Sequence, residues 1–165
     1  MCRGYGDAMA LDRFRAAVAV YGIVRDGDRI LLMSRAGSGY HDGELSLPAG
    51  HLEGGEDVKT ALVRELAEEL AIVVDPDDCQ MSLVAHRAPE TSADLEYVDL
   101  FFTIEHWEGT PTIGEPDKCT ELLWTAADKL PPDVIEYVSR AMLAYAHDEH
   151  LLLEGWGTSE PASFL

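Results

Sequence analysis

Hydrophobic residues near the beginning of the chain follow the spacing of β-strands. Residues 16–24 are rich in Val, Ile and Tyr, and a second apolar run covers residues 29–33. The Asp-Gly pair at residues 26–27 lies between these runs, where such a pair is typical of a tight β-hairpin. A further short strand is predicted over residues 45–47, because Pro48 cannot donate the hydrogen bond that would continue it.

Two later segments have the spacing of amphipathic helices. Residues 57–70 contain neither Gly nor Pro, and their apolar positions recur every four residues. The residues of this stripe are Val58, Leu62, Leu66 and Leu70. Apolar residues recur with helical spacing again over residues 133–147. The pattern therefore predicts two helices, each with one apolar face.

The remaining segments complete a mixed arrangement of helices and strands. Strands are predicted over residues 81–85, 95–106 and 122–124, and loops over residues 37–43 and 109–116. This mixture, with at least one hairpin, indicates an α/β or α+β fold built around a mixed sheet.

The chain has 165 residues, which suits one compact domain. Residues 1–12 mix Gly, Asp and Arg without periodicity, so we expect a flexible N-terminal tail there. The domain is expected to cover residues 13–150, and residues 151–165 are expected to form a C-terminal extension.

Composition limits the surroundings and the partners of the protein. The chain carries 31 Asp and Glu against 12 Lys and Arg, a formal net charge of −19. Binding to duplex DNA or to an anionic membrane depends on Lys and Arg, so both partners are disfavoured. An anionic ligand would need a cation as mediator.

Targeting and cysteine patterns indicate a cytoplasmic protein. No apolar run approaches the ~20 residues of a membrane helix, and the N-terminus has no apolar core of a signal peptide. The three cysteines never form a C-x-x-C pair, which argues against a disulfide framework and a thiolate zinc site.

Acidic residues gather on the first predicted helix. Glu65, Glu68 and Glu69 occupy positions i, i+3 and i+4, so they project from one face within about one turn. Like charges at these spacings cost roughly 0.2–0.5 kcal/mol per pair, and acids in the last turn also oppose the helix dipole. A divalent cation among the carboxylates would reverse both penalties. Hard oxygen ligands favour Mg²⁺ or Mn²⁺, although a solvated acidic face is the alternative.

A Gly-rich turn precedes this helix, and the combined segment resembles the signature of the Nudix hydrolases. That signature reads G-x5-E-x7-R-E-U-x-E-E-x-G-U, where U is an aliphatic residue. One position departs from it, because Ala71 stands where the family has its second glycine. The matching residues are Gly50, Glu56, Arg64, Glu65, Leu66, Glu68, Glu69 and Ile72. The resemblance covers most of residues 14–147.

The resemblance implies an α/β/α sandwich around a mixed sheet. It also implies Mg²⁺-dependent hydrolysis of a nucleoside diphosphate linked to another moiety, with Mn²⁺ as a substitute for Mg²⁺. By this resemblance Glu65, Glu68 and Glu69 are metal ligands together with the carbonyl of Gly50. Glu56 is then the salt-bridge partner of Arg64. Arg64 and the three metal-binding glutamates are candidate catalytic residues.

The general base varies among such families, so several acids stay open for this role. Glu69 or Glu65 could serve, as could an acid from a distant loop. Glu115 is our candidate in that loop, because residues 109–116 could fold back over the site. Glu121 and Glu90 are alternatives, and each loop acid could equally be an ordinary surface residue.

Substrate contacts are less well defined by the sequence. Arg35, at the end of the second strand, could bind a phosphate or lie on the surface. Tyr40, Phe102 and Trp124 could stack on a base, although such aromatic residues are more often part of a core. The expected substrate is a small nucleotide, an unmodified or oxidised nucleoside triphosphate.

Two alternatives to this function remain open. ADP-ribose or a nucleotide sugar could be the substrate instead, or the chain could be a non-catalytic nucleotide-sensing domain of the same fold. A homodimer is compatible with the sequence, which does not determine the oligomeric state.

Overall fold

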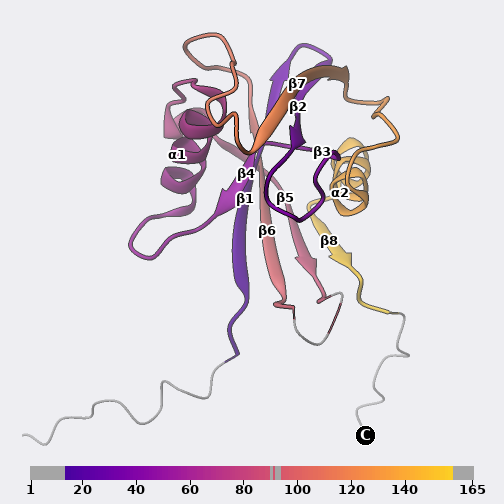
Figure 1. The fold of residues 1–165 in the computed structure, drawn as a ribbon. Coiled ribbons are helices and arrows are strands. Elements are labelled where there is room, and N and C mark those ends of the chain that lie inside the picture. Colours follow the sequence, from indigo (N-terminus) through magenta and orange to yellow (C-terminus); the bar gives the residue numbers. More distant parts are fainter. Residues whose placement is uncertain (1–13, 90, 92–93, 158–165) are drawn as a thin grey trace, which may run out of the picture.

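The computed structural model describes residues 14–89, 91 and 94–157 (Figure 1). The predicted tail at residues 1–12 and the last part of the predicted extension, residues 158–165, lie outside the described residues. The helices are α1 (Val58–Leu70), α2 (Glu136–Ala146) and a 3₁₀ turn η1 (Pro76–Asp78). The strands are β1 (Ala17–Asp26), β2 (Arg29–Arg35), β3 (Leu45–Ser46), β4 (Ala49–His51), β5 (Gln80–Arg87), β6 (Tyr97–Ile104), β7 (Cys119–Ala126) and β8 (Leu151–Glu154).

The strands form one mixed sheet. Its main path runs β3-β2-β1-β6-β5-β8, and in addition β4 pairs with β1 while β7 pairs with β2. β1 runs parallel to β6, and β5 runs parallel to β8, whereas the other pairings are antiparallel. β1 therefore has β6 along one side and β4, then β2, along the other.

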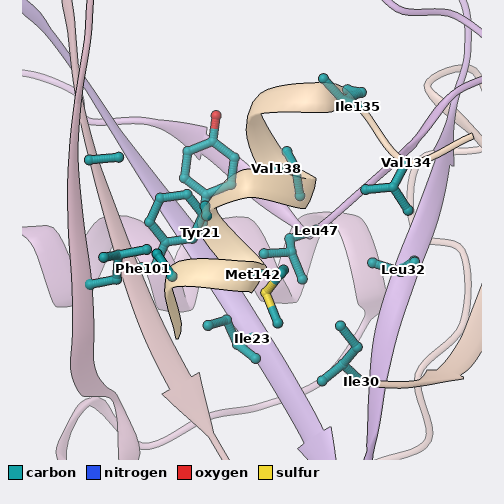
Figure 2. Close-up of a cluster of buried hydrophobic side chains, with 14 of the residues drawn as sticks. Tyr21, Ile23, Ile30, Leu32, Leu47, Phe101, Val134, Ile135, Val138 and Met142 are labelled. Atoms are coloured by element: carbon teal, nitrogen blue, oxygen red, sulfur yellow. The ribbon is translucent and has the colours of Figure 1, made fainter. Parts of the chain in front are cut away.

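The sheet has a hydrophobic cluster on each face, and one helix packs on each cluster (Figure 1). Phe101 and Phe102 are neighbours on β6, yet they belong to opposite clusters because successive side chains of a strand alternate. Both are 1% exposed, and burying each such side chain contributes about 1.5–3 kcal/mol. Figure 2 shows the cluster beneath α2, where Tyr21 and Phe101 lie near Met142. The α/β/α sandwich expected from the sequence is confirmed.

The predicted hairpin is also confirmed. Asp26 at the end of β1 pairs with Arg29 at the start of β2. Gly27 in the turn has φ of 65°, a conformation that glycine adopts without steric cost. The turn sequence therefore explains the position of β2 beside β1.

The ends of α1 are determined by local chemistry. The Asp57 side chain accepts hydrogen bonds from the backbone N–H groups of Lys59 and Thr60, at 2.9 and 3.1 Å, and so satisfies donors in the first turn. At the other end Ala71 is in the left-handed conformation, with φ of 55°. This is the position at which the family signature has glycine, so an alanine performs the turn here at a steric cost.

The structure differs from the sequence-based expectation at several edges of the sheet. β4 is not predicted, because three residues containing Gly50 are too short for a recognisable pattern. Residues 151–154, which fall in the predicted C-terminal extension, form β8 and pair with β5 at the edge of the sheet. β7 begins at Cys119 and ends at Ala126, so it is longer than the predicted segment. None of the described helices is long and apolar enough to cross a membrane.

Candidate active site

The close contact between β4 and α1 brings Gly50 against Glu65. Gly50 is held in register opposite Val20 of β1, and α1 packs beside β4. A Cβ atom at Gly50 would lie 1.9 Å from Cδ and 2.0 Å from Oε1 of Glu65. Position 50 therefore accepts no side chain, and its backbone lies directly against the Glu65 carboxylate.

Glu69 lies on the same side of α1, one turn further along the helix. Its Oε2 atom accepts a hydrogen bond from the backbone N–H of Ala49, at 2.9 Å. Burial raises the pKa of Glu69 to about 8; the Ala49 N–H opposes this shift, whereas Glu65 and Glu115 add to it. Two carboxylates and the Ala49–Gly50 backbone thus meet at one wall.

Arg64 connects this wall to the loop that precedes α1. Its Nη2 and Nε atoms donate to Oε1 and Oε2 of Glu56, at 2.8 and 3.3 Å, in a two-pronged ion pair. Its Nη1 atom donates to Oε1 of Glu65 at 2.6 Å. These bonds to Glu56 and Glu65 raise the pKa of Arg64, and the bond to Arg64 lowers the pKa of Glu56. The loop, the helix and one carboxylate are therefore held together by a single guanidinium.

Glu68 is more exposed than the other two carboxylates. Its side chain is 51% exposed, and Oε2 lies 3.6 Å from Nη1 of Arg64. Within the described part of the chain, no group of three or more His, Cys, Asp or Glu side chains stands ready to hold a metal ion. The donors nevertheless fit a hard divalent cation, since Gly50, Glu65 and Glu69 supply oxygen atoms at one wall. Arg64 Nη1 lies 2.6 Å from Oε1 of Glu65 and 3.6 Å from Oε2 of Glu68, so one guanidinium bridges these two carboxylates.

The loop after β6 packs against the end of α1 and reaches the same wall. The backbone N–H groups of Thr112 and Gly114 donate to the carbonyls of Leu70 and Glu69, each at 2.9 Å, so the loop caps the helix. A Cβ atom at Gly114 would lie 1.9 Å from the carbonyl oxygen of Glu68, so the approach needs glycine. The next residue, Glu115, is thereby brought close to Glu69.

These residues line a cleft of about 610 Å³. Gly50, Glu65 and Glu69 are on its lining, and so is Glu115, whose carboxylate pairs with Lys118 Nζ at 2.8 Å. Positive charge is also present. The cations on the lining are Arg35, Arg87 and Lys118. The cleft therefore carries both acidic and basic side chains, and the basic ones can bind the anionic part of a ligand.

Several sequence-predicted residues meet in this cleft and others do not. Arg35 lines it, with Nε donating to the Tyr40 carbonyl at 3.2 Å, and Tyr40 lines it too. Phe102 is buried in the cluster beneath α1, so the structure excludes it as a base-stacking residue. Trp124 stacks on Trp107, with ring centroids 6.2 Å apart, and is not on the lining.

Two of the alternative acids are not brought to the cleft by the described structure. Glu121 is exposed on β7 and is not on the lining, whereas Glu90 lies outside the described residues. Sequence reasoning also missed Arg87, Tyr97 and Tyr137, which cluster together and form a second wall of the cleft. The alternation along β6 was the available signal for Tyr97, but Arg87 follows the predicted strand and carries no pattern.

The architecture and the signature residues at this cleft define the class of protein. The family model for the NUDIX domain matches residues 13–146 of the chain. The chain therefore belongs to the NUDIX family and is a Nudix hydrolase.

Individual relatives agree with this assignment. The chain is 31% identical over 115 residues to the 8-oxo-dGTP diphosphatase of Escherichia coli (strain K12), a match that covers 67% of this chain and 84% of that protein. It is 42% identical over 105 residues to the ADP-ribose pyrophosphatase of Methanocaldococcus jannaschii, covering 64% of this chain and 60% of that protein. The crystal structure of a MutT NUDIX hydrolase from Burkholderia pseudomallei superposes with a TM-score of 0.71 at 26% identity, covering 78% of this chain and 97% of the other.

Proposed function

We propose that the protein is a Mg²⁺-dependent pyrophosphohydrolase that cleaves a phosphoanhydride bond in a nucleoside triphosphate, unmodified or oxidised. The observation that carries this proposal is the wall formed by Gly50, Glu65 and Glu69 at the side of the cleft. The similarity to an 8-oxo-dGTP diphosphatase supports the choice of substrate.

The acids of α1 would hold the metal. Glu65, Glu68 and Glu69, with the carbonyl of Gly50, would bind Mg²⁺, and Mn²⁺ would substitute for it. A cation bound there neutralises charge on the phosphates and on the departing group. Arg64 positions Glu65 through their bond at 2.6 Å and fastens the helix to the preceding loop through Glu56.

The remaining residues of the cleft divide the chemistry among them. Arg35 and Lys118 are the cations available to phosphate oxygens. In the proposed step the oxygen of a water attacks phosphorus, the bond from phosphorus to the bridging oxygen breaks, and a carboxylate takes the proton of the water. Glu69, Glu65 and Glu115 are the candidate bases, and Glu69 interacts electrostatically with each of the other two. A protein of charge −19 needs the cation before it can accept a polyphosphate.

A second substrate class is favoured by one observation. The relative at 42% identity is named as an ADP-ribose pyrophosphatase, so ADP-ribose is the alternative substrate. Both substrates place a diphosphate beside the acidic wall and differ only in the attached groups.

A substrate panel tests the proposal. Purified protein is incubated with Mg²⁺ and, separately, dGTP, 8-oxo-dGTP, dATP, dITP and ADP-ribose, and the products are identified by chromatography. We expect release of a nucleoside monophosphate, loss of turnover with excess EDTA, and recovery with Mn²⁺. Glu68→Gln removes the charge of one proposed ligand and should lower turnover, and Glu149→Gln, which changes an exposed acid outside the cleft, is its matched control. Nucleotide binding without turnover in the wild-type protein would instead indicate a sensing domain.

The cytoplasmic location and the homodimer stay predictions. Size-exclusion chromatography with light scattering measures the second directly.

A further inference from the structure

The second wall of the cleft is built around one arginine. The guanidinium of Arg87, at the end of β5, lies between the rings of Tyr97 and Tyr137, with its central carbon 4.4 and 4.2 Å from their centroids. Its Nε atom donates to Oδ2 of Asp99 at 3.0 Å. The Arg87 side chain is only 11% exposed, and that of Asp99 is 1% exposed. Three contacts therefore fix the plane and the direction of the guanidinium.

The clamp is itself tied to the core beneath α2. The Tyr21 hydroxyl donates to the Tyr137 hydroxyl at 3.3 Å, and the Tyr21 ring stacks on Phe101 with centroids 4.6 Å apart. Figure 2 shows Tyr21 and Phe101 side by side within this core. The arginine is thus preorganised, so little conformational freedom remains to be lost when a ligand binds.

The open part of Arg87 is its terminal edge. The two tyrosine rings cover its faces, and Asp99 occupies Nε. The structure gives Nη1 and Nη2 no hydrogen-bond partner among the described residues, although Arg87 lines the cleft. Arg87 therefore presents N–H donors, and no acceptor, to a ligand in the cleft.

The charge of this group argues against a phosphate as its ligand. The ion pair with the buried Asp99 neutralises Arg87, and Oδ1 of Asp99, which has no hydrogen-bond partner among the described residues, adds uncompensated negative potential nearby. Arg35 and Lys118, in contrast, interact electrostatically with the acidic wall. Arg35 acts on Glu69, and Lys118 interacts with Glu65 and Glu69. Arg87 is left for the part of the substrate away from the metal.

A neutral ligand with two adjacent acceptors matches such an edge. Guanine and hypoxanthine present O6 and N7 side by side, which is the pattern that arginine binds in a two-pronged manner. Adenine presents N7 beside an amino group, and the N–H donors of that amino group would face the N–H donors of Arg87.

Given the proposed function, we propose that Arg87 is a specificity-determining residue that binds the O6/N7 edge of an unmodified 6-oxopurine, so that dGTP and dITP are preferred over dATP. The inference rests on the placement of the phosphates at the acidic wall. Asp99, Tyr97 and Tyr137 are positioning residues that act through Arg87.

The test compares dITP with dATP, because these substrates carry a 6-oxo and a 6-amino group and are otherwise closely alike. We expect the wild-type protein to favour dITP and dGTP over dATP in kcat/KM by about 10- to 100-fold. Arg87→Lys keeps the positive charge beside Asp99 but removes the two-pronged edge, so the ratio of dITP to dATP should fall toward unity. A ratio measured on one preparation is independent of the fraction of folded enzyme.

Arg29→Lys is the matched control. Arg29 also lies over an aromatic ring, 5.5 Å from the Trp124 centroid, and pairs with Asp26 at 2.5 Å, but it is not on the cleft lining. This variant should keep the wild-type ratio. An equal loss for dITP and dATP in Arg87→Lys would overturn the inference, because it would place Arg87 on a phosphate or a sugar.

A binding experiment separates this inference from the proposed function. If neither triphosphate is hydrolysed, the proposed function fails, but calorimetry with IMP and AMP still reports on Arg87. Tighter binding of IMP that Arg87→Lys abolishes would support the inference. Equal binding of IMP and AMP by the wild-type protein would overturn it.

Discussion

The two walls of the cleft use charge in opposite ways. The acidic wall keeps Glu65 and Glu69 close together, with Glu69 partly buried, and leaves them dependent on Arg64 or on a cation for compensation. The second wall neutralises Arg87 internally with Asp99 and encloses it between tyrosine rings. Carboxylates that share one arginine can exchange that partner for a metal ion. A buried ion pair is rigid, and it presents its remaining N–H groups to a ligand in a fixed direction. The comparison indicates that one wall is suited to reaction and the other to recognition.

The largest expected effect comes from removing a charge of the acidic wall. Glu69→Gln keeps an acceptor for the Ala49 N–H but loses a ligand charge, so kcat should fall by about 10²- to 10³-fold. The decisive measurement is steady-state hydrolysis at saturating Mg²⁺, with Glu149→Gln beside it. A variant that retains wild-type kcat would remove Glu69 from the reaction.

The contact between Gly50 and Glu65 provides a second mutational test of the acidic wall. A methyl group at position 50 would occupy the place of the Glu65 carboxyl, at 1.9 Å, so Gly50→Ala must displace that carboxylate. We expect kcat/KM to fall by about 10- to 100-fold, in line with a misplacement of about 1 Å. Gly54→Ala is the control, because a Cβ there meets nothing within 4 Å. Equal activity of the two variants would contradict the assigned geometry.

The sequence reveals these two walls to different degrees. The acidic wall comes from two segments close in the sequence, Ala49 and Gly50 of β4 and the glutamates at helical spacing on α1, and these carboxylates could be predicted from the sequence. The bridge that Arg64 forms between Glu65 and Glu68 could not, since it depends on a side-chain arrangement that only the three-dimensional structure reveals. The helices and the hairpin were predictable for the same local reasons.

The second wall, formed by Arg87, Tyr97 and Tyr137, had no comparable signal in the sequence. Arg87, Tyr97 and Tyr137 come from β5, β6 and α2, and the pairing of Arg87 with Tyr97 across two strands brings them together. No local pattern marks an arginine whose partners are distant in the chain. β4 and β8 were missed for a related reason, because short strands are defined by their neighbours rather than by their own pattern.

The stability of the metal-free protein provides a third prediction. The substitution that lowers activity should raise the free energy of unfolding. The pKa of Glu69 is about 8 in the folded protein against an ordinary value of 4.5, so the folded state is increasingly penalised as the pH rises from about 4.5 to 8. Glu69→Gln removes this penalty and should raise the free energy of unfolding by roughly 2–4 kcal/mol at pH 8.

Urea denaturation in EDTA between pH 5 and pH 8.5 checks this expectation. The advantage of Glu69→Gln should shrink toward low pH, where the wild-type carboxyl is protonated, and also in excess Mg²⁺, which stabilises only the charged site. An advantage that does not vary with pH would show that the carboxyl is not strained by burial.

The smallest expected effect lies at the end of α1, next to the acidic wall. Ala71→Gly relieves the left-handed conformation, with φ of 55°, and should stabilise the protein by about 0.5–1 kcal/mol without a change in activity. Ala67→Gly, in the exposed interior of the same helix, should destabilise by about 1 kcal/mol and is the matched control for glycine itself. Thermal unfolding of both variants distinguishes relief of strain from a general effect of glycine.

The central claim is that the acidic wall exists to hold a divalent cation. Calorimetric titration of Mn²⁺ into the metal-free protein tests this most directly, with wild type, Glu69→Gln and Glu149→Gln compared at one pH. The account predicts saturable binding by the wild type and by Glu149→Gln, and binding weakened at least about tenfold in Glu69→Gln. Identical isotherms for all three proteins, or no saturable binding by the wild type, would contradict it.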